Sequence, residues 1–217
     1  MSMSEQTKAA SIIERAKNII ISPDAEWARI DGEQTTIQKL FTDYAAILAA
    51  IPALAGALGG LVFGYGAMGF HARLSIGGAI SSAIATYVMA LASVVVVAFI
   101  IEMLAPSFGA TKDRVQAFKV AVYASTAGWL AGIFSLVPAL GFLGLLGLYN
   151  IYLLYRGLPK LMKVPEEKAL LYTGVVILGA IVVAVALGVL LAPFMHLGMS
   201  GGVGGGMGGR GMMGGGY

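Results

Sequence analysis

The chain has 217 residues, of which 58% are hydrophobic and only 12% are charged, and its mean hydropathy is +0.85. A soluble domain has about a quarter charged residues, so this composition excludes an ordinary soluble protein and requires lipid as the solvent. The chain has no cysteine, which excludes disulfides, thiol catalysis and cysteine-ligated metal sites.

Residues 1–43 are predicted to form an amphipathic cytoplasmic arm. Apolar side chains share one face of a helix in its first half: Ala9, Ile12, Ile13, Ala16, Ile19 and Ile20. Ser22 followed by Pro23 is typical of a helix start, and Trp27 suits the headgroup zone of a membrane. A further helix start is predicted near Thr35. We expect the arm to lie on the inner membrane surface or on the cytoplasmic loops, and an undocked soluble arm is the alternative.

Five apolar stretches are long enough, or nearly so, to cross a hydrocarbon core that needs about 20 helical residues. They cover residues 44–63, 76–101, 115–137, 138–155 and 170–191. The stretches predict an all-α fold, a polytopic bundle of five transmembrane helices within residues 44–195. The third and fourth are joined by the uncharged segment "SLVPALGF". Pro138 cannot continue a helix and Gly141 permits a tight reversal, so a helical hairpin is predicted there.

The basic residues alternate in position between these stretches. Twelve of the fourteen Lys and Arg residues fall in the arm, between the second and third stretches, or between the fourth and fifth. Only Arg73 and Arg210 fall on the other side. The positive-inside rule then places the N-terminus in the cytoplasm and the C-terminus outside. Residues 196–217 are rich in glycine and methionine and are predicted to form a disordered tail.

The charged loop between the fourth and fifth stretches is the main candidate site. Its basic residues are candidates for contact with anionic lipid or a partner: Arg156, Lys160, Lys163 and Lys168. Pro159 and Pro165 bracket "KLMK", and they predict a shaped turn that presses on the membrane surface or on the arm.

Small residues recur every four positions in several of the stretches, and such stripes let helices approach closely. The candidates for helix packing are Gly56, Gly60, Gly128, Gly132 and Gly188, together with Asn150 as a hydrogen-bonding residue. The spacing predicts a compact bundle or an oligomer and does not separate the two.

Polar groups that could support catalysis are few. Glu102 and Lys119 lie near the ends of their stretches and are expected to have structural roles. His71 and His196, the latter between Met195 and Met199, match no ligand spacing, so we expect no metal and no cofactor. We also expect no enzymatic activity.

The segments "YLLYRGLPKLMKVPEEKALLYT", "GLLGLYNIY" and "RAKNIIISPDAEWARI" resemble the bacterial branch of the Yip family, five-span membrane proteins named for interaction with Ypt/Rab GTPases in eukaryotes. The likeness covers residues 12–191. It implies a non-catalytic membrane protein with a cytoplasmic N-terminus. The acidic segment of the DLYGP type that eukaryotic members carry is absent, so we expect no Rab-type GTPase partner.

Together these patterns predict an integral protein of a bacterial inner membrane that acts in membrane organisation or scaffolding. It would act through self-association, as a homo-oligomer or with another membrane protein, and through contacts of its cytoplasmic face with protein or membrane lipids. A transporter or channel-like bundle for a small solute, ion or lipid is the alternative. No nucleic-acid partner is expected.

Overall fold

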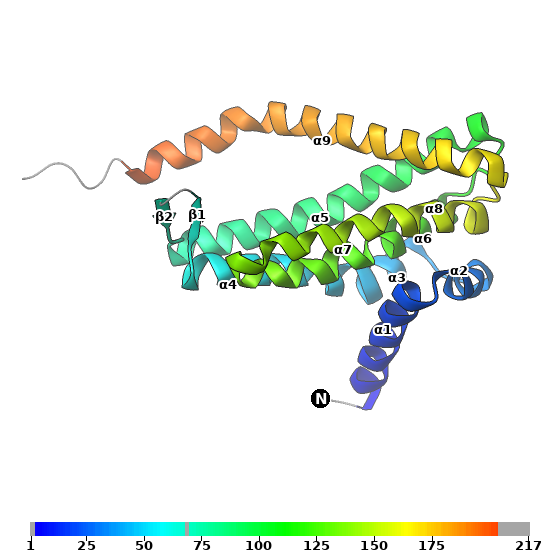
Figure 1. Cartoon of the computed structure of the whole chain (residues 1–217), viewed down its shortest axis with the longest axis horizontal. Coiled ribbons are helices and arrows are strands. Elements are labelled where there is room, and N and C mark those ends of the chain that lie inside the picture. Colours follow the sequence, from blue (N-terminus) through cyan, green and yellow to red (C-terminus); the bar gives the residue numbers. More distant parts are fainter. Residues whose placement is uncertain (1–2, 68–69, 204–217) are drawn as a thin grey trace, which may run out of the picture. The chain divides into compact units, whose positions relative to one another are not determined.

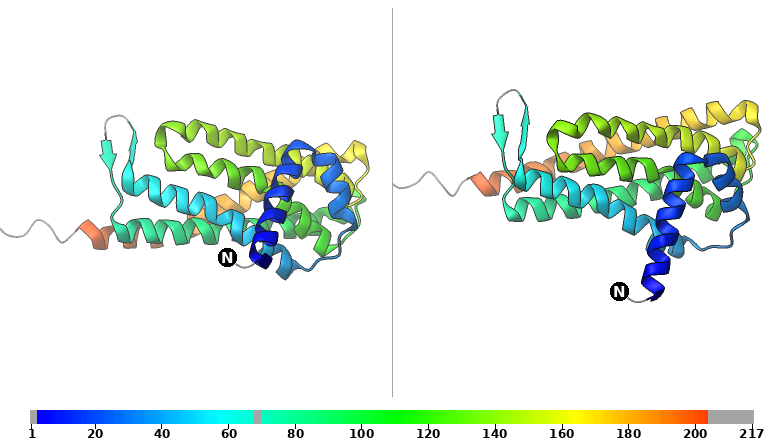
Figure 2. Two further views of the ribbon diagram at one scale, coloured as in Figure 1. Left: turned by 90° about the horizontal axis from the view of Figure 1, so that it is seen from below. Right: turned by 60° about the horizontal axis from the view of Figure 1, so that its bottom comes forward.

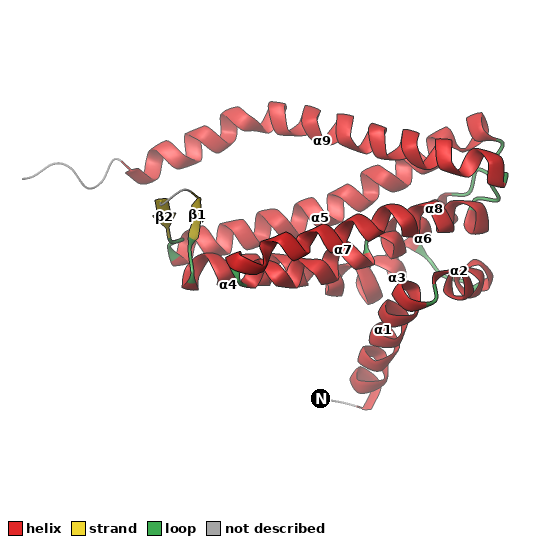
Figure 3. Ribbon diagram, in the orientation of Figure 1, coloured by secondary structure: helices red, strands yellow, loops and turns green. Residues whose placement is uncertain are grey.

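The computed structural model describes residues 3–67 and 70–203, and the surroundings of side chains for residues 10–64 and 73–186. Five helical segments within these residues are long and apolar enough to cross a membrane: Ile37–Val62, Ile76–Phe108, Arg114–Leu136, Pro138–Leu161 and Glu166–Ala186. Each overlaps one predicted stretch. The prediction of an all-α bundle with five candidate spans is therefore confirmed (Figure 3).

The N-terminal arm consists of two helices, α1 (Met3–Ile21) and α2 (Pro23–Gly32). α2 begins as predicted, with Ser22 at the N-cap and Pro23 in the first turn, although the Ser22 side chain makes no capping hydrogen bond. α1 crosses the helices of the bundle at an angle (Figure 2). The arm therefore meets the bundle mainly through the end of α1 and through α2.

The first span is composite: α3 (Ile37–Leu40), the π-helical turn η1 (Phe41–Ala45) and α4 (Ala46–Val62). Thr36 caps α3 by accepting a hydrogen bond from the Lys39 N–H at 3.2 Å, one residue from the predicted start. Tyr44 lies in η1, and its hydroxyl is 2.9 Å from the Thr126 hydroxyl in the third span. A buried hydrogen bond thus ties the start of the first span to the third.

A short antiparallel hairpin links α4 to the second span, and the sequence did not predict it. Its strands are β1 (Tyr65–Ala67) and β2 (Phe70–Ala72), with Gly66 opposite His71. The second span comprises α5 (Ile76–Leu104) and the 3₁₀ turn η2 (Ala105–Phe108). Ser75 caps α5 by accepting a hydrogen bond from the Gly78 N–H at 3.1 Å.

The third and fourth spans form the predicted helical hairpin. The third contains α6 (Arg114–Ala124), α7 (Thr126–Ala131) and the 3₁₀ turn η3 (Gly132–Leu136). The fourth contains η4 (Pro138–Leu148), which is 3₁₀-helical, and α8 (Tyr149–Leu161). α7 and η3 both pack against η4. Val137 alone, in an extended conformation, separates the two spans.

η4 is unusually long for a 3₁₀ helix, and its glycines follow the 3₁₀ period. Gly141, Gly144 and Gly147 are three residues apart, so with three residues per turn they share one side. A Cβ added at Gly147 would lie 3.4 Å from the Gly128 Cα of α7. At this point the glycine side of η4 lets the two backbones of the hairpin approach closely.

The turn between the fourth and fifth spans is shorter than predicted. α8 continues to Leu161, so Arg156, Pro159 and Lys160 belong to the helix rather than to a loop. Pro159 lies inside α8, two residues before the helix ends, although it removes one N–H that would bond the carbonyl four residues earlier. Lys163 follows the C-cap with φ 56°, a left-handed conformation common just after a helix end. The Met162 carbonyl accepts a hydrogen bond from the Thr111 N–H at 2.8 Å, which links this turn to the segment before α6.

The last helix is α9 (Glu166–Val203). The chain divides into two compact units, Met1–Ala180 and Ile181–Tyr217, and the boundary lies within α9. In the first unit, the Tyr172 hydroxyl donates to the Ile101 carbonyl of α5, and its ring stacks on Phe108 with centroids 4.6 Å apart. The helix includes residues 196–203, which the sequence assigned to a disordered tail, because helical hydrogen bonding continues past the apolar run. Residues 204–217 of the predicted tail lie outside the described residues.

Replacement of Gly132 by alanine is expected to destabilise the bundle. A Cβ at this position would lie 2.5 Å from the Cβ and 3.0 Å from the Cα of Pro52 in α4, and the proline ring cannot move aside. Overpacking of this kind costs about 1–3 kcal/mol. We expect Gly132→Ala to lower the unfolding midpoint in an SDS titration. Gly174→Ala is the matched control, because nothing lies within 4 Å of its added Cβ. Equal losses in the two variants would contradict close packing at Gly132.

Candidate functional site

The N-terminal arm docks where α6, α8 and the turn before α9 come together (Figure 1). α2 packs on α8, and α3 packs on α6. We call this surface the docking face. On the arm side it consists of α2 and Glu33. On the bundle side it consists of Lys119, Arg156, Gly157 and Lys163.

Trp27 is the apolar anchor of the docking face. Its side chain is fully buried, so the expectation that it lies in the headgroup zone is wrong. The indole lies against Gly157, where an added Cβ would be 2.8 Å from Cζ2 and 3.0 Å from Cε2 of the ring. It also meets Tyr123 of α6 edge to face, with centroids 6.4 Å apart. The indole N–H has no hydrogen-bond partner among the described residues, so packing must supply the stabilisation.

Lys119 provides the polar anchor. The side chain is almost fully buried, and its ammonium donates to the Ile30 carbonyl at 2.9 Å and to the Glu33 carbonyl at 2.7 Å. These carbonyls lie at and just beyond the C-terminal end of α2, whose partial negative charge attracts a cation, and the Ile30 carbonyl also accepts a hydrogen bond from the Glu33 N–H at 3.2 Å. Lys119 of the third span therefore caps the last helix of the arm.

Two ion pairs border this interface. Arg156 Nε donates to Asp24 Oδ1 at 2.7 Å, and Lys163 Nζ donates to Asp31 Oδ2 at 2.5 Å. All four side chains are about one third exposed or more, so each pair contributes at most about 1 kcal/mol. The two pairs therefore contribute more to the orientation of α2 on α8 than to the free energy of docking.

The four predicted lipid- or partner-contact residues thus divide into two groups. Arg156 and Lys163 are bonded to the arm. Lys160 and Lys168 are exposed, and Lys160 lines a cavity of about 110 Å³ beside Arg156 and Glu166. The turn does contact the arm, since Lys163 Nζ donates to Asp31 Oδ2.

Arg15 joins the two helices of the arm to the bundle. Its guanidinium donates to Glu26 at 2.7 Å and to Glu33, and it lies 5.5 Å from the centroid of the Tyr123 ring. Burial lowers the pKa of Arg15, but the hydrogen bond to Glu33 and the nearby charges together outweigh it, so the pKa lies above the ordinary value. Arg15 is therefore positively charged at every physiological pH.

The comparisons with known proteins agree with this architecture. A family model of the Yip1 domain matches residues 17–213. The chain belongs to the Yip1 domain family. The match begins within α1 and so includes the end of α1, all of α2 and all five candidate spans of this Yip1-domain protein. No curated protein matches the chain, and no solved structure matches it.

Asn150 and its neighbours show how polar and small residues are used inside the Yip1 domain. The Gly128 N–H of α7 donates to Asn150 Oδ1 of α8 at 2.8 Å. Gly60 is buried in α4, and its carbonyl accepts a hydrogen bond from the Leu74 N–H at 3.0 Å. Gly56 is half-buried in α4, and the surroundings of Gly188 lie outside the described residues.

Two further close contacts lie in the Yip1 domain, one at Gly59, which was not singled out from the sequence, and one at Glu102, which was expected to be structural. A Cβ added at Gly59 would lie 2.5 Å from the Ser135 carbonyl oxygen of η3. Glu102, buried at the end of α5, accepts a hydrogen bond from Arg114 Nε at 2.8 Å. The described residues contain no group of three or more His, Cys, Asp or Glu side chains that could hold a metal ion.

Proposed function

We propose that this Yip1-domain protein is a non-catalytic component that organises its membrane, by self-association and by contacts made at its cytoplasmic face. The observation that carries the proposal is how polar groups in the spans are used. Asn150 accepts a hydrogen bond from the Gly128 N–H in the other span of its hairpin. The hydroxyls of Tyr44 and Thr126 share a hydrogen bond, and the Lys119 ammonium donates to the Ile30 carbonyl of the arm. Each of these groups fastens one part of the chain to another. Transport gains less support, because a conduction path needs polar groups that face the path.

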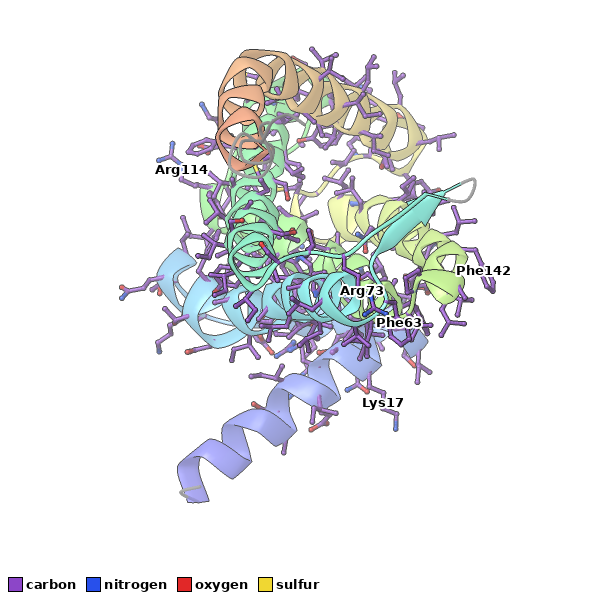
Figure 4. All side chains as sticks on the ribbon, turned by 90° about the vertical axis from the view of Figure 1, so that its left-hand side faces the viewer. Lys17, Phe63, Arg73, Arg114 and Phe142 are labelled. Carbon is purple, nitrogen blue, oxygen red and sulfur yellow. The ribbon has the colours of Figure 1, made fainter. Side chains whose placement is uncertain are left out.

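The proposed location is a bacterial cytoplasmic membrane, with the docking face in the cytoplasm and the C-terminus outside. The distribution of charge supports this orientation. The docking face carries Lys119, Arg156 and Lys163, with Arg114 and Lys160 nearby on the same helices. Arg73 lies at the other end of the bundle, after β2 (Figure 4). Basic residues favour the cytoplasmic side of a membrane.

Lys160 and Lys168 are the residues proposed to make outward contacts at the cytoplasmic face. Both are exposed. Lys160 lies at the end of α8 and Lys168 at the start of α9, on either side of the turn in which Lys163 pairs with Asp31 of the arm. The proposed partners are anionic membrane lipid, a second copy of this chain, or another membrane protein. A Rab-type GTPase is not among the proposed partners.

Topology and self-association can be tested in one strain. A reporter fused after Tyr217 is expected to be active outside the cytoplasm, and one inserted at Lys163 inside. Two differently tagged copies are expected to co-purify in native nanodiscs formed directly from the membrane. A reversed reporter result would contradict the orientation. Single copies in every nanodisc, counted by photobleaching steps, would contradict self-association.

A further inference from the structure

A groove of about 510 Å³ lies between the third and fourth spans, which form the helical hairpin. Leu130 of α7 and Phe134 of η3 line one wall, and Leu146 of η4 lines the other. Ile20, near the end of α1, lies at one end of the groove next to Tyr149. The Tyr149 hydroxyl donates to the Ile20 carbonyl at 3.0 Å, so the hydroxyl in the lining is already engaged. The groove therefore offers an almost wholly apolar surface.

The groove is hollow because small residues lie in its wall. Ala127 and Ala131 of α7 line it, four residues apart on one side of the helix. Its walls belong to the candidate spans Arg114–Leu136 and Pro138–Leu161, so in a membrane it lies at the depth of the hydrocarbon. Its volume falls within the range of about 300–1,000 Å³ typical of sites for small ligands. An apolar, chain-like occupant fits this surface.

A positive charge lies one helical turn along α1 from Ile20, which lines the groove. Lys17 is three residues before Ile20, so the two residues are neighbours on one side of α1. The Lys17 side chain is exposed and projects away from the bundle (Figure 4). No ion pair joins Lys17 to another residue in the described part of the chain. Its ammonium is therefore free to bind an anionic group outside the bundle, about one helical turn from the Ile20 end of the groove.

We propose that the groove binds one acyl chain of a membrane phospholipid and that Lys17 binds the phosphate of the same lipid. The arm then belongs to the site, because Ile20 borders the chain and Lys17 meets the headgroup. The site rests on the proposed function for its placement in the cytoplasmic leaflet. It does not depend on self-association.

A photoreactive lipid tests the site. The probe is phosphatidylglycerol with a diazirine in one acyl chain, at low mole fraction in phosphatidylcholine nanodiscs that hold the full chain. Light should label the peptide that contains Leu130 and Phe134, as mapped by mass spectrometry. Leu130→Trp fills the groove and should abolish this labelling. Ile84→Trp is the matched control, because Ile84 is 59% exposed on α5 and does not line the groove.

Lys17→Gln tests the headgroup contact. A lysine near the surface contributes about 1 kcal/mol toward an anionic lipid, so labelling of the groove should fall about fivefold. Lys112→Gln removes another exposed lysine and should leave the labelling unchanged. The unfolding midpoint of each variant shows whether it is folded.

Three results would overturn the proposal. Groove labelling no stronger than labelling around Ile84 would mean that only bulk lipid touches these residues. Cross-links from the groove to a second copy, or to residues 204–217, would assign the groove to another occupant. Subunit counting on the same nanodiscs separates failure of the lipid site from failure of the proposed self-association.

Discussion

Replacement of Trp27 by alanine is expected to release the arm from the bundle. Trp27 is fully buried against Gly157 and Tyr123, and truncation of such a side chain to alanine costs about 3–5 kcal/mol. That cost corresponds to a shift of more than about a hundredfold in the equilibrium between docked and open arm. Trypsin should then cleave at Arg29, an exposed residue of α2, much faster in inside-out vesicles.

Trp27→Phe is the matched control for this experiment. Phenylalanine keeps most of the aromatic contact and removes the indole N–H, which has no partner among the described residues. Because a buried unpaired donor costs about 1–3 kcal/mol, its removal offsets part of the lost packing. Cleavage of Trp27→Phe should therefore stay close to that of the parent protein. Equal cleavage of the alanine variant and the parent protein would show that Trp27 does not anchor the arm.

Replacement of Lys119 by methionine is expected to have the second-largest effect. Methionine keeps the apolar stem but removes the ammonium that bonds the carbonyls of Ile30 and Glu33. Hydrogen bonds to charged groups contribute about 1.5–3 kcal/mol each, and the loss leaves carbonyls at the end of α2 without this partner. Because methionine also removes the cost of burying an ammonium, the loss should be smaller than the sum of the two bonds, and we expect docking to weaken by about 2–4 kcal/mol, with faster hydrogen exchange in α2.

Lys112→Met serves as the control for Lys119→Met, because Lys112 is exposed and precedes α6. It removes the same charge without touching the arm. Exchange in α2 should be unchanged in this variant. If the two lysine variants change exchange equally, net charge rather than capping of α2 governs the arm.

The five spans could be predicted because their cause is local. Long apolar runs and the uncharged proline turn at Pro138 suffice to mark them, and the structure has a helical segment over each run. The end of α8 differs from the prediction because Pro159 indicates a helix break from local sequence alone, whereas α8 continues through it to Leu161. The glycines of η4 recur every three residues, and this spacing in the sequence is typical of a 3₁₀ helix.

The docking face was harder to predict because it joins residues far apart in the chain. Trp27 looked like a membrane-interface residue, and nothing near it in the sequence points to Gly157. One signal was available: Asp24 and Asp31 are seven residues apart, and so are Arg156 and Lys163. Residues seven apart lie on one face of a helix, which holds for the two acids of α2, and the matching spacing of the two bases suggests a partner for each, although Lys163 lies just past the end of α8. The structure forms both pairs.

We propose that the arm is docked on the cytoplasmic side of the membrane, and one cross-link tests this most directly. The chain has no cysteine, so Asp31→Cys and Lys163→Cys together introduce one defined pair where Lys163 Nζ lies 2.5 Å from Asp31 Oδ2. A short bis-maleimide that cannot cross membranes is added to inside-out vesicles and, separately, to intact spheroplasts. An intramolecular cross-link is expected in the vesicles and none in the spheroplasts. A cross-link formed only in spheroplasts would contradict the orientation, and reaction of both cysteines in vesicles without a cross-link would contradict docking of the arm.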